Sequence, residues 1–147
     1  MTCDCGAPAG ALGPCEAYFH AILAEEQGDP AMYAWHAPVV CAYFLQHPAR
    51  GAQKYLDGQF RMLQLYVAEG LEALHRLSAR QVAANKRGRT PPPIEGYDPL
   101  PQRAPGPFRA AFSGLPVSEG SFVADGPDAY GRRVLEIAEA TVASWRA

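Results

Sequence analysis

The stretch Leu56–Leu77, LDGQFRMLQLYVAEGLEALHRL, sets the fold class of this 147-residue chain. Its apolar residues recur at intervals of three and four, at Leu56, Phe60, Leu63, Val67, Leu71, Leu74 and Leu77. This spacing places them on one face of an α-helix. The pattern extends from Pro48 to about Asn85 and predicts one amphipathic helix, or two helices hinged near Gly70. Gly88 is the predicted C-terminal cap.

Helical patterns also lie on either side of this stretch. Residues 15–27 predict a first helix, which begins after Pro14 and ends at Gly28. Residues 30–46 predict a second, which Pro38 should kink or split near Ala34 and which His47-Pro48 ends. Residues 128–146 predict the last helix. Because no run with strand periodicity stands out, the sequence predicts an all-α fold, an irregular bundle of four to five helices.

Residues 88–127 differ from the rest of the chain in composition. They hold nine of the 14 prolines and six of the 14 glycines, so no long regular element is expected there. Their aromatic and aliphatic residues make the segment too apolar for a solvated linker. We therefore predict an ordered, irregular strap across the helices. Residues 1–14 are predicted to form a cysteine knuckle. The knuckle, the helices and the strap are expected to form a single domain over residues 1–147.

The overall composition excludes some classes of function. A net charge of −2 argues against a nucleic-acid binder, which usually carries a basic excess. No uncharged run is apolar enough for a membrane span, and the first residues lack the pattern of a signal peptide. We therefore expect a cytoplasmic protein with reduced cysteines. The aromatic side chains of Tyr33, Trp35 and Phe44 are candidates for a homodimer interface.

The soft metal-ligating residues cluster near the N-terminus. All four cysteines and three of the four histidines lie within the first 47 residues. Thiolate and imidazole are the ligands that Zn²⁺ prefers in proteins. The predicted metal site consists of Cys3, Cys5 and Cys15, with His36 or His47 as the fourth ligand. The histidine left over would support a ligand or cap a helix.

Two details qualify this set of ligands. The pair Cys3-Asp4-Cys5 has one intervening residue, where zinc knuckles usually have two or more. On one straight helix, His36 and His47 would lie about 16 Å apart, so both could bind one ion only if the chain bends. Cys41 stands in an apolar run and is expected in the core, and Gln46 is expected to face solvent rather than support a metal ligand.

Three classes of function remain open. A closed site of three cysteines and one histidine would make the zinc structural and the protein a binding or regulatory module, which we rank first. A metal-dependent, hydrolase-like enzyme would need His36 and His47 on the ion beside an open position. A thiol redox sensor would use the same cysteines. The sequence has no phosphate-binding loop, Gly-x-Ser-x-Gly or His-Glu-x-x-His, so no catalytic residue is assigned.

Several short motifs resemble a family of uncharacterised bacterial proteins, a domain of unknown function. They are Cys5-Gly6-Ala7, Gly13-Pro14-Cys15, His36 and the run Ala42-Tyr43-Phe44-Leu45-Gln46-His47-Pro48. The family pattern has a knuckle ending in Cys-Gly-Ala, a cysteine opening a helix, a histidine, and Tyr-x-Leu-Gln-His-Pro. The resemblance implies that Cys5, Cys15, His36 and His47 belong to one site, whereas Cys3 stands one residue from the family position. It implies no activity.

Overall fold

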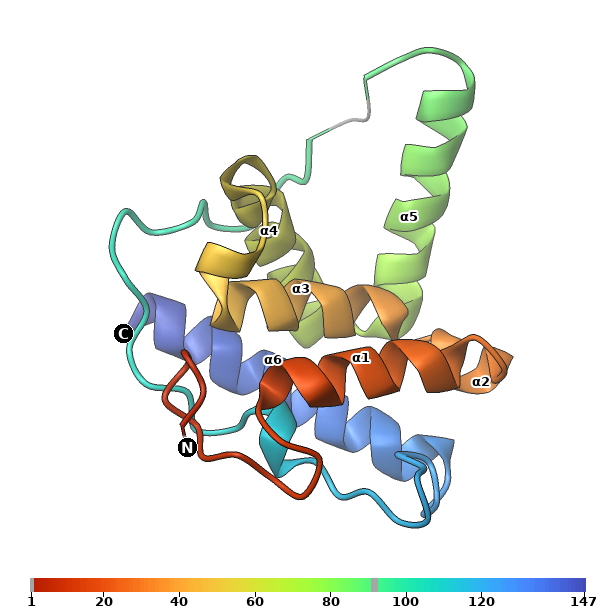
Figure 1. Cartoon of the computed structure of the whole chain (residues 1–147). Helices are drawn as coiled ribbons and strands as arrows, with labels where there is room; N and C mark the ends of the chain where they lie inside the picture. The colour runs from red at the N-terminus through yellow and green to blue at the C-terminus, as the bar shows by residue number, and fades with distance from the viewer. Residues whose placement is uncertain (1, 91–92) are drawn as a thin grey trace.

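A computed structural model describes residues 2–90 and 93–147 of the chain. Within these residues it has six α-helices and two short 3₁₀ helices, and no strand (Figure 1). The elements are α1 (Cys15–Glu26), α2 (Pro30–Tyr33), α3 (His36–Gln46), η1 (Pro48–Arg50), α4 (Gln53–Glu69), α5 (Leu71–Lys86), η2 (Phe112–Gly114) and α6 (Pro127–Arg146). The predicted all-α class is confirmed.

The long amphipathic pattern forms two helices, α4 and α5, which meet at Gly70. Gly70 has φ +94° and ψ 179°, a backbone conformation that residues with a side chain rarely adopt. The predicted hinge is therefore confirmed. At the far end of α5, the N–H of Arg89 bonds to the carbonyl of Ala84, and the N–H of Gly88 bonds to that of Asn85. This pair of bonds is the Schellman motif, with Gly88 as the predicted cap.

The predicted second helix is also split, into α2 and α3, at Ala34 and Trp35. Pro38 lies in the first turn of α3, where its missing N–H costs no helical hydrogen bond. Asp29 caps α2, because its side chain accepts a hydrogen bond from the N–H of Met32. Both breaks occur at predicted positions, and together they raise the helix number from four or five to six.

Helix α3 forms the centre of the molecule and packs against α1, α4 and α6. Helix α5 packs mainly against α4 and projects away from the other helices (Figure 1). The interior is apolar and aromatic, and its largest fully buried side chains include Tyr18, Ile22, Met32, Leu45, Leu56, Phe60, Leu63, Leu74, Phe112, Phe122 and Tyr130. The indole N–H of Trp145 in α6 donates to the carbonyl of Leu45 at 2.8 Å, which ties α6 to the last turn of α3.

The Pro-rich segment 88–127, of which residues 91–92 lie outside the described chain, crosses the helices as predicted. It is irregular apart from η2, and it buries Phe112, Leu115 and Phe122. Gln46, expected to face solvent, is instead 2% exposed, and this expectation was wrong. Its side-chain amide donates to the Ala110 carbonyl of the strap at 2.8 Å and to Thr141 Oγ1 of α6 at 3.0 Å. Gln46 thus joins α3, the strap and α6.

The three aromatic residues considered for a dimer interface differ in their exposure. Tyr33 is 49% exposed, but Trp35 and Phe44 are partly buried. Trp35 packs edge-on against Tyr130, and Phe44 packs against Phe19. These contacts cover part of Trp35 and Phe44 within the chain itself, and the homodimer interface stays a prediction. Among the described residues, no helix is long and apolar enough to cross a membrane.

Candidate metal centre

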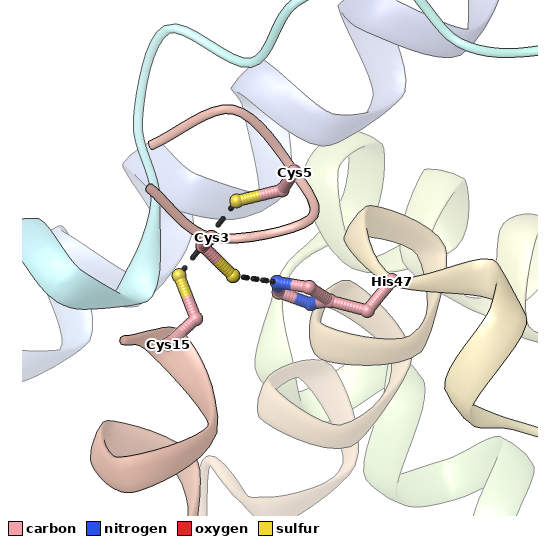
Figure 2. A group of neighbouring side chains, drawn as sticks. All are labelled: Cys3, Cys5, Cys15 and His47. Atoms are coloured by element: carbon pink, nitrogen blue, oxygen red, sulfur yellow. Dashed lines mark hydrogen bonds between the residues drawn. The ribbon is translucent and has the colours of Figure 1, made fainter. Parts of the chain in front are cut away.

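Three cysteines and one histidine from three separate segments meet at one end of α1 and α3 (Figure 2). Cys3 and Cys5 belong to the N-terminal knuckle, Cys15 is the first residue of α1, and His47 follows the last residue of α3. The distance from Cys3 Sγ to His47 Nε2 is 3.2 Å, and Cys5 Sγ lies 3.7 Å from Cys15 Sγ. All four ligand atoms lie within 4.8 Å of one another, so this cluster could hold a metal ion.

The knuckle is a tight turn that brings its two sulfurs to the same side. The N–H of Cys3 donates to the carbonyl of Ala7 at 2.7 Å, and the N–H of Gly6 donates to the carbonyl of Cys3 at 2.8 Å. From outside, the guanidinium of Arg50 bonds to the carboxylates of both Asp4 and Glu16. Arg50 therefore links η1 to the knuckle and to α1 around the cysteines.

His47 is held in one orientation by the end of α3. Its Nδ1 donates to the carbonyl of Tyr43 at 2.8 Å, which leaves the Nε2 lone pair directed at Cys3. The Tyr43 ring lies 4.4 Å from the imidazole between centroids and stacks on Phe19 at 3.9 Å. His47 is only 2% exposed, and this burial lowers the pKa of its imidazole. The side chain is therefore neutral at pH 7, the form in which histidine binds metals.

The surroundings of the cysteines differ in their effect on the thiols. Burial acts to raise the pKa of Cys3, but the backbone N–H groups and the side chains of Cys5 and Cys15, which hydrogen-bond to its sulfur, together outweigh it and lower the pKa. Burial raises the pKa of Cys5 to about 12. Backbone N–H groups pointing at a sulfur, together with the N-terminus of α1, stabilise thiolate charge. The cluster thus favours the thiolate form of Cys3. A bound cation would favour the thiolate form of the neighbouring cysteines as well.

The donor set fits a tetrahedral ion. With Zn–S distances of about 2.3 Å and Zn–N of about 2.0 Å, two sulfurs lie about 3.8 Å apart, and a sulfur and a nitrogen about 3.5 Å apart. The observed 3.7 Å between Cys5 and Cys15 and 3.2 Å between Cys3 and His47 are close to these spacings. Cys3, Cys15 and His47 are buried, and Cys5 is half-buried. Small side-chain movements would bring all four onto one ion.

His36, the other histidine proposed as a ligand, is not part of this cluster. It begins α3, whereas His47 follows its end, so the helical rise separates the two by about 16 Å. His36 Nδ1 is hydrogen-bonded to the carboxylate of Glu26, and its ring stacks on Tyr33 at 4.8 Å. Burial raises the pKa of Glu26, and the bond from His36 partly offsets that rise. Cys41, predicted to be a core residue, is buried in α3.

Sequence reasoning missed three groups that support these side chains. Ser113 of η2 donates from Oγ to the Pro8 carbonyl at 2.8 Å and lies 3.6 Å from Cys15 Sγ. Tyr43 orients His47, and Glu26 holds His36. Only the second could have been found, because Tyr43 stands four residues before His47, and a histidine at the end of a helix can donate to the carbonyl one turn earlier, which here also accepts the N–H of His47. Nothing in the sequence connects Ser113 with Pro8 or Glu26 with His36.

Comparisons with known proteins give one result for this chain. No curated protein and no solved structure matches it. A family model described as a family of unknown function, DUF5946, matches residues 1–146, which is nearly the whole chain. The resemblance to an uncharacterised family inferred from the sequence is thereby confirmed. The chain belongs to DUF5946.

Proposed function

We propose that the protein binds one Zn²⁺ through Cys3, Cys5, Cys15 and His47, and that the ion is structural. The observation that carries this proposal is the convergence of four soft ligand atoms within 4.8 Å from three separate segments. Three sulfurs and one imidazole nitrogen form a common donor set for structural zinc. Carboxylates, which Mg²⁺ and Ca²⁺ prefer, are missing from this group, and this favours zinc over those ions.

The structural role follows from the number and burial of the ligands. Four protein ligands fill a tetrahedron and leave no position for water or substrate. The enzyme alternative required His36 and His47 on the same ion, and α3 holds these residues at opposite ends. When bound, the ion would join the knuckle to α1 and α3 and neutralise the thiolates. A domain stabilised in this way serves as a binding or regulatory module, which is the role we propose.

The proposal is tested by measuring the metal content of untagged protein with elemental mass spectrometry. We expect about one zinc per chain, and loss of most of it in Cys15→Ser, because Cys15 is 0% exposed at the centre of the cluster. The matched control is Cys41→Ala, which removes a buried thiol outside the cluster and should keep the zinc. Circular dichroism shows whether each variant is folded, and Co²⁺ substitution of the parent reports tetrahedral thiolate coordination independently of the variants.

The thiol redox alternative gains support from one distance. Cys5 Sγ and Cys15 Sγ are 3.7 Å apart, close enough for small movements to form a disulfide. Parent protein without stoichiometric metal would contradict the zinc proposal, as would equal zinc content in Cys15→Ser and Cys41→Ala. A Cys5–Cys15 disulfide found by mass spectrometry in such metal-free protein would then support redox chemistry.

A further inference from the structure

A cavity of about 610 Å³ lies directly beside the metal centre. One wall is the knuckle from Cys5 to Ala9, the second is the strap between Pro107 and Pro116, and the third is α6 at Arg133, Glu136 and Ile137. Figure 1 shows the N-terminal knuckle next to the strap and α6. The volume is in the range of pockets that bind small organic molecules. Apart from Cys5, no residue that lines the cavity was a candidate site residue in the sequence analysis.

The cavity combines an apolar surface with charges of both signs. Phe108, Leu115 and Ile137 supply apolar side chains, and Arg109, Arg133 and Glu136 supply the charges. Arg133 is already paired, since its guanidinium bonds to Asp125 at 2.8 Å. Within residues 2–90 and 93–147, neither Arg109 nor Glu136 forms a salt bridge. One positive and one negative side chain, both exposed to solvent and outside any salt bridge, therefore line the cavity beside its apolar residues.

We propose that this cavity binds a small organic zwitterion with an apolar body, of the kind represented by an amino acid with a large side chain. Arg109 would receive the carboxylate, because a guanidinium offers paired N–H donors that match its two oxygens. Glu136 would receive the ammonium group, and the apolar body would contact Phe108, Leu115 and Ile137. The inference rests on the proposed function in one respect, namely that the metal holds the knuckle wall in place.

The cavity and the metal centre share residues, which connects ligand binding to the proposed module. Cys5 is a candidate metal ligand and also lines the cavity. Ser113 lines it as well, and its hydroxyl bonds to Pro8 in the knuckle wall and lies 3.6 Å from Cys15 Sγ. A bound molecule would therefore rest against the segment that the metal orders, so this cavity is the part of the module that recognises a ligand.

The test compares three probes with the same indole body and different charged groups: L-tryptophan has an ammonium and a carboxylate, indole-3-propionate only the carboxylate, and tryptamine only the ammonium. Each is titrated into zinc-loaded protein by isothermal calorimetry, and the binding residues are located by ¹H–¹⁵N NMR. We expect tryptophan to bind at least fivefold more tightly than either single-charge analogue, because each analogue forms only one of the two charge-assisted contacts, with Arg109 or with Glu136. The NMR shifts should fall in residues 5–9, 107–116 and 133–137.

Two variants assign the charges. Arg109→Gln should remove the advantage of tryptophan over tryptamine, and Glu136→Gln should remove its advantage over indole-3-propionate. The matched controls are Arg132→Gln and Glu139→Gln, which change exposed residues of α6 outside the cavity and should leave all three affinities unchanged.

The outcomes separate this inference from the metal proposal, since zinc is measured in every sample. Zinc-loaded protein that does not bind tryptophan, or binds the three probes equally, overturns the inference and leaves the metal proposal standing. The same holds if both cavity variants behave like their controls. Conversely, folded protein without zinc that shows the expected binding pattern contradicts the metal proposal and the role of zinc in holding the knuckle wall, while ligand binding by the cavity stands.

Discussion

At the scale of single residues, the two histidines of α3 differ in what surrounds them. His47 is buried, donates through Nδ1 to Tyr43 and directs Nε2 at Cys3. His36 is bonded to the carboxylate of Glu26 at the opposite end of the helix. An imidazole oriented by a carbonyl, with its second nitrogen among thiols, is the usual arrangement of a metal-binding histidine. The proposed site therefore depends on His47 and not on His36.

This contrast gives a prediction for the pair of alanine variants. His47→Ala should weaken zinc binding at least tenfold, because it removes a ligand, whereas His36→Ala should leave the zinc affinity within twofold of the parent. Competition with a chromophoric zinc chelator measures both affinities. His36→Ala leaves the buried Glu26 carboxylate without its partner, so a loss of stability of about 1–3 kcal/mol is expected for that variant. Equal zinc affinities for the two variants would contradict the ligand assignment.

At the scale of elements, the break between α4 and α5 depends on one residue. A single amphipathic pattern runs through both helices, and without a break it would form one long rod. Gly70, with φ +94° and ψ 179°, turns the chain so that α5 leaves the bundle beside α4 (Figure 1). The stripe on α4 faces α3 and α6, while the stripe on α5 faces mainly α4. The direction of α5 is thus set by a conformation that glycine allows.

Two glycine-to-alanine variants test this explanation. Gly70→Ala should lower the free energy of unfolding by about 1–3 kcal/mol, because alanine is strained in this backbone conformation. Gly58→Ala is the matched control inside α4, where an added Cβ has no atom within 4 Å. It should raise stability by about 0.5–1 kcal/mol through helix propensity. Urea denaturation followed by circular dichroism measures both, and a neutral or stabilising Gly70→Ala would contradict the strain argument.

At the scale of the whole molecule, the candidate metal centre joins parts of the chain that have few other links. The described knuckle residues are mostly exposed, whereas α1 and α3 belong to the core. Apart from the cysteines, the described knuckle residues are held by polar contacts with Arg50, Ser113 and the Tyr18 hydroxyl, and by packing of Ala7. An ion bound by all four ligands would add to stability in proportion to the logarithm of its concentration over its dissociation constant.

Removal of the metal should therefore destabilise the molecule unevenly. At zinc concentrations about 1,000-fold above Kd, binding contributes about 4 kcal/mol, and chelation should lower the melting temperature by about 8–16 °C. Calorimetry with and without EDTA measures this shift. In hydrogen-exchange measurements, the backbone amides of residues 2–14 should lose protection first. The amides of α4 and α6 should stay protected, because neither helix carries a metal ligand. An unchanged melting temperature in protein shown to contain zinc would contradict a structural role for the ion.

Local patterns in the sequence determined much of what the structure contains. The three-and-four spacing predicts the helices, Gly70 and Pro38 predict the breaks, and Pro48 predicts the end of α3, because each depends on neighbouring backbone conformation alone. The residue types and clustering of Cys3, Cys5, Cys15 and His47 likewise predict a metal site. These features require no knowledge of how the helices pack.

Other features depend on contacts between residues far apart in the sequence, and only the tertiary structure decides them. The straightness of α3 separates His36 from His47, and packing brings His47, but not His36, beside a knuckle more than forty residues away. Gln46 is buried because the strap and α6 both reach it, although its own neighbours predict exposure. The cavity also forms only where the knuckle, strap and α6 meet. The sequence by itself thus determined the helices and the ligand types, while tertiary packing decided which ligands meet, since a local pattern carries no information about distant partners.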